Sequence, residues 1–208
     1  MLKLYGQYRS RAFRVAWLCA ESNIAYEHVI VTIHADDATA KAAWYRELNP
    51  NARIPTIDDD GFIMWESGAI NLYLAEKYKS ALWPTDWAGK GRAMQWAFYI
   101  SNDVEVPMIA VFQHRFRFPP EKRIAAIADQ YEPILLGKLA VLEAALGRSK
   151  YFQGPQWGMA DFMIGSVLYS LHEMGYAKLE EYPRLNAWLT ESVARPAARK
   201  AIALRKAS

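Results

Sequence analysis

The stretch NPNARIPTIDDDGFIMWESGAINLYLAEKY, residues 49–78, decides the fold of this chain. It contains two short β-type runs, residues 56–58 and 62–65, joined by an Asp-rich turn that ends in glycine. An X-Pro step, Ile54–Pro55, precedes the first run, and an apolar helical pattern begins at Ser67. The stretch therefore predicts a β-hairpin followed by a helix.

Three features of this stretch suit an extended peptide with an anionic end. Pro55 has no N–H, and a cis bond before it would leave Ile54 free to offer its N–H and C=O to a peptide, in the manner of an added strand. Ser67 can bind a carboxylate with its hydroxyl and the free N–H groups of the helix end, and Glu66 can bind an ammonium group. A simpler interpretation is also open, in which Ser67 caps the helix and Pro55 only starts a strand.

The sequence NPNARIP followed by WESGAINLYLAEKY closely resembles the glutathione-binding signature of the glutathione transferase superfamily. The resemblance extends from Lys3 to about Ala201. It implies that the residue before the proline, here Ile54, pairs with the cysteinyl backbone of glutathione. It also implies that Glu66 and Ser67 hold the γ-glutamyl end, with Arg53 as a further contact.

Length and composition exclude several classes of protein. The chain has 208 residues, enough for one compact unit or two small domains with a real core. Its net charge of +3, without a basic block, gives no indication of nucleic-acid binding. No apolar run approaches a membrane span, and the N-terminus MLKLYG enters a strand without a signal peptide. The single cysteine, Cys19, excludes an intrachain disulfide and a CxxC pair, so we expect a reducing cytoplasm.

The rest of the chain predicts two domains. Strands at 3–5 and 27–31 flank a helix from Ser10 to about Glu21, and a helix at 38–48 precedes the hairpin. Because a strand–helix–strand unit crosses over right-handed, the first part is a small mixed sheet covered by helices, which is the thioredoxin-like α/β plan. The second part is all-α, with helical patterns at 90–117, 121–146, 161–174, 182–193 and 195–205. We place a glutathione-binding domain at 1–80, a linker at 81–88 and an all-α domain with the acceptor-substrate pocket at 89–208.

Two residues compete for the activation of a thiol. Ser10 lies at the start of the first helix, where a hydroxyl donor and the positive end of the helix both favour a thiolate. Capping that helix is the simpler role for Ser10, and the two roles are compatible. SRAFR at 10–14 resembles the Ser-x-x-Cys-Arg segment of serine-type transferases, in which the serine activates glutathione. Tyr5 falls where tyrosine-type members place their catalytic tyrosine, so Ser10 and Tyr5 both stay open as the activating residue. We favour Ser10, because it lies at a helix N-terminus whereas Tyr5 lies inside a strand.

Other polar residues fit structural roles. Asp161 can accept the N–H of Gly158 as half of a capping box at the start of an apolar helix. Cys19 lies within an apolar helix pattern, which is typical of a core residue. We predict no metal site because four histidines show no metal-ligand spacing, namely His28, His34, His114 and His172.

Taken with the resemblance, these features indicate a detoxifying glutathione transferase that needs no cofactor besides its co-substrate glutathione. The expected reaction is attack of the thiolate on a small apolar electrophile, held between the domains against Val106, Pro107, Ile109 and Phe112. SNDVE at 101–105 resembles the segment by which some members lend an aspartate across a dimer, so we expect a homodimer with Asp103 at its partner's site. A solvated helix position is the alternative for Asp103.

Two other functions stay open. The main alternative is a catalytically inactive protein of the same fold that serves as a protein–protein interaction module. A glutathione-dependent thiol oxidoreductase is a weaker alternative, because Ser10 stands in the place of the cysteine that it would need.

Overall fold

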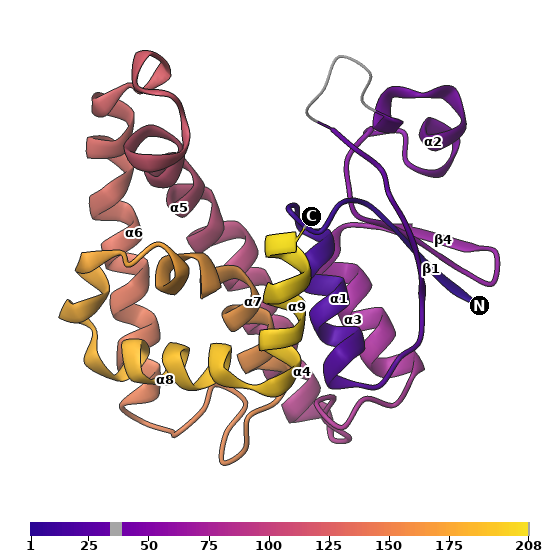
Figure 1. Ribbon diagram of the computed structural model, residues 1–208. Coiled ribbons are helices and arrows are strands. Elements are labelled where there is room, and N and C mark those ends of the chain that lie inside the picture. The colour runs from indigo at the N-terminus through magenta and orange to yellow at the C-terminus, as the bar shows by residue number, and fades with distance from the viewer. Residues whose placement is uncertain (34–38, 208) are drawn as a thin grey trace. The chain divides into compact units, whose positions relative to one another are not determined.

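The computed structural model describes residues 1–33 and 39–207, and these form two compact units. The first contains Met1–Trp83 together with the C-terminal residues from Ala194, and the second contains Pro84–Val193. Figure 1 labels the main elements of both.

A four-stranded mixed sheet forms the base of the first unit. Its strands are β1 (Leu2–Tyr5), β2 (Glu27–Val29), β3 (Thr56–Asp59) and β4 (Phe62–Trp65). They lie in the order β2-β1-β3-β4, with β1 parallel to β2 and antiparallel to β3, and β4 antiparallel to β3. Asp60 and Gly61 turn the hairpin with positive φ angles of 53° and 91°, as a tight turn requires. The sheet therefore has the predicted plan, although β2 ends at Val29, earlier than expected.

Among residues 1–33 and 39–207, five helical segments accompany this sheet in the first unit. They are α1 (Ala12–Glu21), η1 (Thr39–Lys41), α2 (Ala43–Leu48), α3 (Ser67–Lys77) and α9 (Pro196–Ala207). Every residue of α1 from Ala12 to Cys19 is buried, because the helix packs against α3, α9 and the sheet at once. The helix predicted at 38–48 is a short 3₁₀ turn and a separate α-helix, and residue 38 lies outside the described residues.

The end of α3 is tied to the hairpin by the buried carboxylate of Asp59. Asp59 Oδ2 accepts hydrogen bonds from Lys77 Nζ at 2.6 Å and from the Tyr73 hydroxyl at 3.0 Å, and Oδ1 accepts one from the Tyr78 hydroxyl at 2.8 Å. Burial alone would raise the pKa of the Asp59 carboxyl, but these hydrogen bonds outweigh it and the pKa is lowered. We did not predict this cluster, because its three donors lie 14 to 19 residues after Asp59 in the chain.

Helix α9 belongs to the first unit, whereas we expected all of 89–208 to form the second domain. It packs along α1 (Figure 1). Arg195, just before α9, donates to both carboxylate oxygens of Glu21 at the end of α1, at 2.8 and 2.7 Å. Periodicity in a sequence shows that a helix forms but not which unit covers its apolar face.

Every regular element of the second unit is helical. The elements are α4 (Trp87–Phe98), η2 (Tyr99–Val104), α5 (Glu105–Phe112), η3 (Gln113–Arg117), η4 (Pro120–Lys122), α6 (Ala125–Leu146), α7 (Met159–Glu173), η5 (Ala177–Glu181) and α8 (Pro183–Ala194). The helix predicted at 90–117 is one run from α4 to η3, and η2 and η3 within it are π-helical. Pro107 accounts for η2, since it has no N–H to donate to the Asp103 carbonyl one turn earlier.

Asp161 anchors α7 more strongly than a half capping box would. Its carboxylate is fully buried and accepts the N–H of Gly158 at 3.2 Å, as predicted, but also the N–H groups of Phe152 and Gln153 and the indole N–H of Trp188 at 2.9 to 3.0 Å. Burial raises the pKa of this carboxyl, against the lowering effect of the four hydrogen bonds. The arrangement has a structural role within the second unit.

Candidate functional site

A small polar cavity in the first unit gathers residues from three segments. Arg11 comes from the start of α1, a second group from the loop before β3, and the third from the junction of β4 and α3. The lining residues are Arg11, Asn49, Asn51, Arg53, Ile54, Pro55, Glu66 and Ser67. The enclosed volume is about 30 Å³, room for one small group, so a longer ligand would lie across the mouth of the cavity. Two guanidinium groups against one carboxylate favour an anionic ligand.

The loop before β3 is held by two buried side chains, Tyr45 and Asn49, to which we assigned no functional role from the sequence. The Asn49 amide donates to the Arg53 carbonyl at 2.8 Å and to Thr56 Oγ1 at 3.2 Å. The Tyr45 hydroxyl donates to the same carbonyl at 2.7 Å and lies 2.8 Å from Thr56 Oγ1. Ala52 adopts a positive φ of 51° in the turn that these contacts close. The position of Arg53 is therefore fixed through its backbone, while its side chain is exposed.

Ile54 lies immediately outside the strand ladder. The Ile54–Pro55 peptide bond is cis, and the pairing of β3 with β1 begins at Thr56, opposite Tyr5. The Ile54 side chain is buried against Gly6, where an added Cβ would come within 3.1 Å of Ile54 Cβ and of Ala12 Cβ. This close approach, together with a φ of +138° at position 6, explains the need for glycine there. The loop after β1 is consequently held against Ile54.

Glu66 and Ser67 stand where the sheet passes into α3. Ser67 is the first residue of α3 and is 7% exposed, so its hydroxyl and the free N–H groups of the first turn lie at the cavity. Glu66 is exposed and has φ 76° and ψ 106°, a conformation that residues with a side chain rarely adopt. Strain of this kind costs of order 1–3 kcal/mol and concentrates at functional sites. The strained backbone at Glu66 is thus an independent sign that its side chain has a role in the cavity.

Ser10 stabilises the turn that leads into α1, whose N-cap residue is Arg11. Its Oγ accepts the N–H of Ala12 at 3.1 Å, and its own proton is donated to the Gln7 carbonyl at 2.7 Å. Its backbone carbonyl accepts a hydrogen bond from Arg205 of α9 at 3.3 Å. Ser10 is not among the residues that line the polar cavity, although its neighbour Arg11 is. To serve a thiolate, the Ser10 hydroxyl would have to turn away from Gln7.

Tyr5, the competing candidate, is a core residue. Its ring is 8% exposed and packs against Trp44 and Tyr45 with centroids 6.4 and 6.3 Å apart. Burial raises the pKa of the Tyr5 hydroxyl, with the neighbouring Asp58 and Glu27 adding to the effect and Lys3 opposing it. A raised pKa makes the hydroxyl a weaker acid.

The remaining predicted residues belong to the second unit. Asp103 forms an ion pair with Lys138 Nζ at 2.6 Å and is 42% exposed. In α5, Val106 is exposed and Ile109 half-buried, whereas Pro107 is buried and Phe112 packs against Phe116 and Tyr176. The four residues predicted for an acceptor pocket therefore do not share one face of the helix.

Among residues 1–33 and 39–207, no three His, Cys, Asp or Glu side chains lie close enough together to hold a metal ion. His28 contacts the Gly6 carbonyl at 2.6 Å, and His114 accepts the N–H of Ile124 at 3.1 Å. His34 lies outside the described residues. Within the same part of the chain, no helix is both long and apolar enough to cross a membrane.

Arg11, Asn49 and Asn51 are the cavity residues that we did not predict as site residues. Asn49 and Asn51 belong to the NPNARIP motif, which could have indicated them as site residues. For Arg11 the sequence offers only its place beside Ser10. The cavity brings together five of the six residues predicted to bind glutathione, namely Arg53, Ile54, Pro55, Glu66 and Ser67. The sixth, Asp103, belongs to the second unit.

Comparisons with known proteins show which family this chain resembles. Residues 1–76 match the family model "Glutathione S-transferase, N-terminal domain", and residues 106–196 match "Glutathione S-transferase, C-terminal domain". Glutathione S-transferase GstB of Escherichia coli (strain K12) is 28% identical over 206 residues, which cover 97% of this chain and 98% of GstB. The transcriptional regulator URE2 of Saccharomyces cerevisiae is 25% identical over an alignment that covers 91% of this chain and 64% of URE2. The theta class glutathione S-transferase of Xanthomonas axonopodis pv. citri, crystallised with glutathione bound, has a TM-score of 0.86 and 27% identity, with 96% of each chain covered.

Proposed function

Because the chain belongs to the glutathione S-transferase superfamily, we propose that it binds glutathione at the polar cavity and transfers its thiolate to a small apolar electrophile. The charge pattern of the cavity carries the proposal. Arg11, Arg53 and Glu66 offer two cations and one anion, which complement the two carboxylates and the one ammonium group of glutathione. Relatives that carry the name glutathione S-transferase support the same assignment.

The binding mode follows from the three segments of the cavity. Glu66 would hold the ammonium group of the γ-glutamyl end, and Ser67 would donate its hydroxyl and the first N–H groups of α3 to the adjacent carboxylate. The backbone of Ile54, outside the ladder, would pair with the cysteinyl residue. Since the cavity encloses room for one small group only, the γ-glutamyl end would be anchored there and the rest of the peptide would lie along its rim.

In this proposal the Ser10 hydroxyl stabilises the thiolate by turning from the Gln7 carbonyl toward the sulfur. The positive end of α1 adds to this effect, and together they lower the pKa of the thiol. The thiolate sulfur then forms a bond to the electrophilic carbon, and the leaving group departs with its bonding electron pair. Tyr5 stays the alternative activator, although its burial in the core supports Ser10.

Isothermal titration with glutathione, paired with turnover of an activated aryl chloride, tests this function. We expect the wild-type protein to bind glutathione and to release chloride. Ser10→Ala should lower turnover much more than it weakens glutathione binding, and Tyr5→Phe should do less. Absence of glutathione binding would refute the function, and a larger loss in Tyr5→Phe would refute the assignment of Ser10.

A second candidate is an interaction protein without catalytic activity. The observation that favours it is the Ser10 hydroxyl, whose proton is already donated to Gln7 and which does not line the cavity. The similarity to URE2, a transcriptional regulator, is consistent with such a role. Glutathione binding without turnover of any electrophile would indicate this candidate. A thiol oxidoreductase is disfavoured, because burial raises the pKa of Cys19, the single cysteine of the chain, to about 12.

A homodimer and an electrophile site on α5 complete the proposal. Three exposed apolar side chains follow one side of α4, at spacings of seven and four residues, and they suit a second copy of the chain: Trp87, Met94 and Phe98. Asp103 would reach the partner's glutathione only by giving up its ion pair with Lys138.

The electrophile would lie against Val106 and Ile109, which share a side of α5. A cytoplasmic location fits the free thiol of Cys19.

A further inference from the structure

A second cavity in the first unit shares no residue with the polar cavity. It has a volume of about 280 Å³ and lies between α1, the segment before β2, and α9. The lining residues are Ala16, Cys19, Ala20, Asn23, Ile24, Ala25, Tyr26, Lys200, Ala201 and Leu204. Helices α1 and α9 pack closely along their length, but alanine side chains on both are too small to fill this space. We call this space the α1–α9 cavity.

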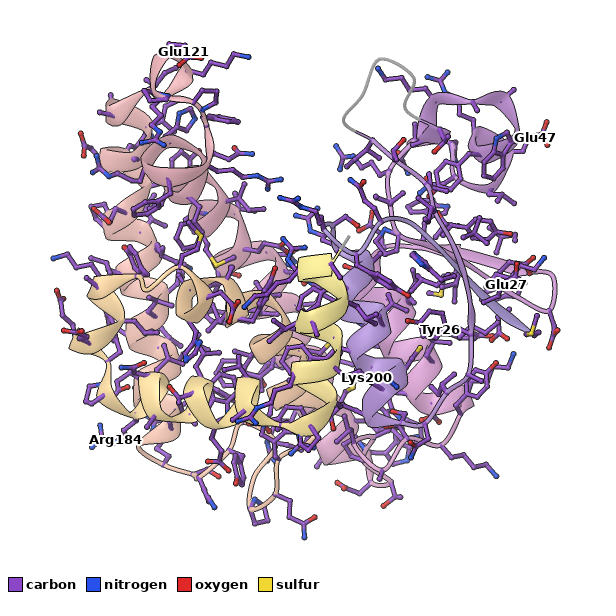
Figure 2. All side chains as sticks on the ribbon, viewed as in Figure 1. Tyr26, Glu27, Glu47, Glu121, Arg184 and Lys200 are labelled. Carbon is purple, nitrogen blue, oxygen red and sulfur yellow. The ribbon has the colours of Figure 1, made fainter. Side chains whose placement is uncertain are left out.

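Lys200 gives the α1–α9 cavity its chemical character. The other lining side chains are apolar or neutral, so Lys200 supplies the one charge. Lys200 is exposed and makes no ion pair or side-chain hydrogen bond with the described residues. Figure 2 shows Lys200 and Tyr26 on the face where α9 lies against α1. An apolar space with one unpaired cation at its rim complements a ligand with an apolar body and a single negative charge.

We propose that the α1–α9 cavity binds a small organic anion, an aryl-alkyl carboxylate or a ligand of similar shape and charge. The apolar body occupies the space between Ala16, Ala20 and Ala201, and the carboxylate pairs with Lys200. The volume is close to the lower end of the range typical of small-molecule sites, about 300–1,000 Å³, and so restricts the ligand to one ring or a short branched chain.

The same cavity is connected to the loop that carries Ser10. The hydroxyl of Tyr26, in the cavity wall, is 2.9 Å from the hydroxyl of Tyr8, whose ring stacks on His28. From α9, Arg205 next to the lining residue Leu204 donates to the Tyr8 carbonyl at 3.0 Å and to the Ser10 carbonyl. A ligand that moved Tyr26 or α9 would therefore act on two supports of the loop that carries Ser10.

Titration calorimetry with 3-phenylpropionate is the direct test, and 3-phenylpropionamide, which has the same body without the charge, is the matched ligand. We expect the acid to bind and the amide to bind at least five-fold more weakly. Lys200→Met should remove that preference, and Ala20→Phe should abolish binding by filling the space. Arg199→Met is the matched control, because it removes a cation from the next position of α9 outside the cavity lining and should leave the affinity unchanged.

Cys19 reports where the ligand sits, because it lines the cavity and is the single cysteine of the chain. We expect saturating 3-phenylpropionate to slow the reaction of Cys19 with a neutral disulfide reagent at least three-fold in the wild type and not in Lys200→Met. Equal affinity for acid and amide, unchanged affinity in Lys200→Met, or no binding at about 10 mM ligand would each overturn the proposal. Competitive displacement by glutathione would place the anion in the polar cavity and overturn it as well.

Discussion

Replacement of Glu66 by glycine should stabilise the protein relative to replacement by alanine, the reverse of the usual order. Both substitutions remove the same carboxylate, so their difference isolates the backbone. At an ordinary position, alanine is more stable than glycine by roughly 0.5–1 kcal/mol, because glycine loses more conformational freedom on folding. At Glu66 the φ of 76° lies in the positive half of the map, which costs glycine less than it costs a residue with a Cβ atom.

The magnitude follows from these two effects. Relief of the strain contributes about 1–3 kcal/mol in favour of glycine. Subtracting the entropic disadvantage of roughly 0.5–1 kcal/mol leaves glycine ahead by about 1 kcal/mol, with a range from about 0 to 2.5. For a chain of this length, 1 kcal/mol corresponds to about 2–4 °C in Tm.

Urea denaturation of Glu66→Gly, Glu66→Ala and Glu66→Gln measures the difference. Glu66→Gln keeps the strain and most of the side chain, so its stability should resemble that of the wild type. All three should bind glutathione more weakly, because none can pair with the ammonium group. An alanine variant as stable as the glycine variant, or more stable, would show that the backbone at position 66 is not strained and would remove one of the two arguments for its role.

Four further outcomes are expected. Ser67→Ala should weaken glutathione binding by about 1.5–3 kcal/mol through loss of a charge-assisted hydrogen bond, and an unchanged titration would place the γ-glutamyl end elsewhere. Because the pKa of Asp59 is lowered on folding, its carboxylate stabilises the folded state above the ordinary pKa of 3.8, and this stabilisation is lost as the pH falls through the pKa of the folded state. Urea midpoints of Asp59→Asn should therefore vary less between pH 5.5 and about 3 than those of the wild type. Tyr45→Phe should cost about 1–2 kcal/mol of stability and weaken glutathione binding, whereas loss of stability alone would separate the loop from the site. Phe98→Glu should convert a dimer into monomers in sedimentation at micromolar concentration, and a wild-type monomer that binds glutathione fully would contradict both the dimer and the Asp103 contact.

The parts of the first unit that the sequence predicted are those set by neighbouring residues. The hairpin depends on Asp60 and Gly61, which lie in the turn that they specify. The start of α3 was predicted at Ser67, which is its first residue, although no side chain caps the helix there. Five of the residues predicted to bind the peptide lie within one stretch, so a single motif indicated them together.

The rest depended on contacts between distant segments or on conformations without a local signal. The strained φ of Glu66 and the position of Arg11 in the cavity arise from tertiary packing. Tyr45 looked like any aromatic residue of a short helix, yet its hydroxyl fixes the Arg53 carbonyl. The two π-helical segments share the apolar periodicity of the α-helices around them, so they were predicted as part of one helix.

The chain leaves its first unit at Trp83 and returns to it only at Ala194, after the whole helical unit has been made. During synthesis, therefore, α1 emerges early, and its alanine-rich face has no α9 to pack against until the helical unit has been made. Arg205, which holds the loop around Ser10, is also translated only after that unit. A chain cut just after the helical unit would keep every residue of the polar cavity, but the loop beside it would have lost the support of Arg205.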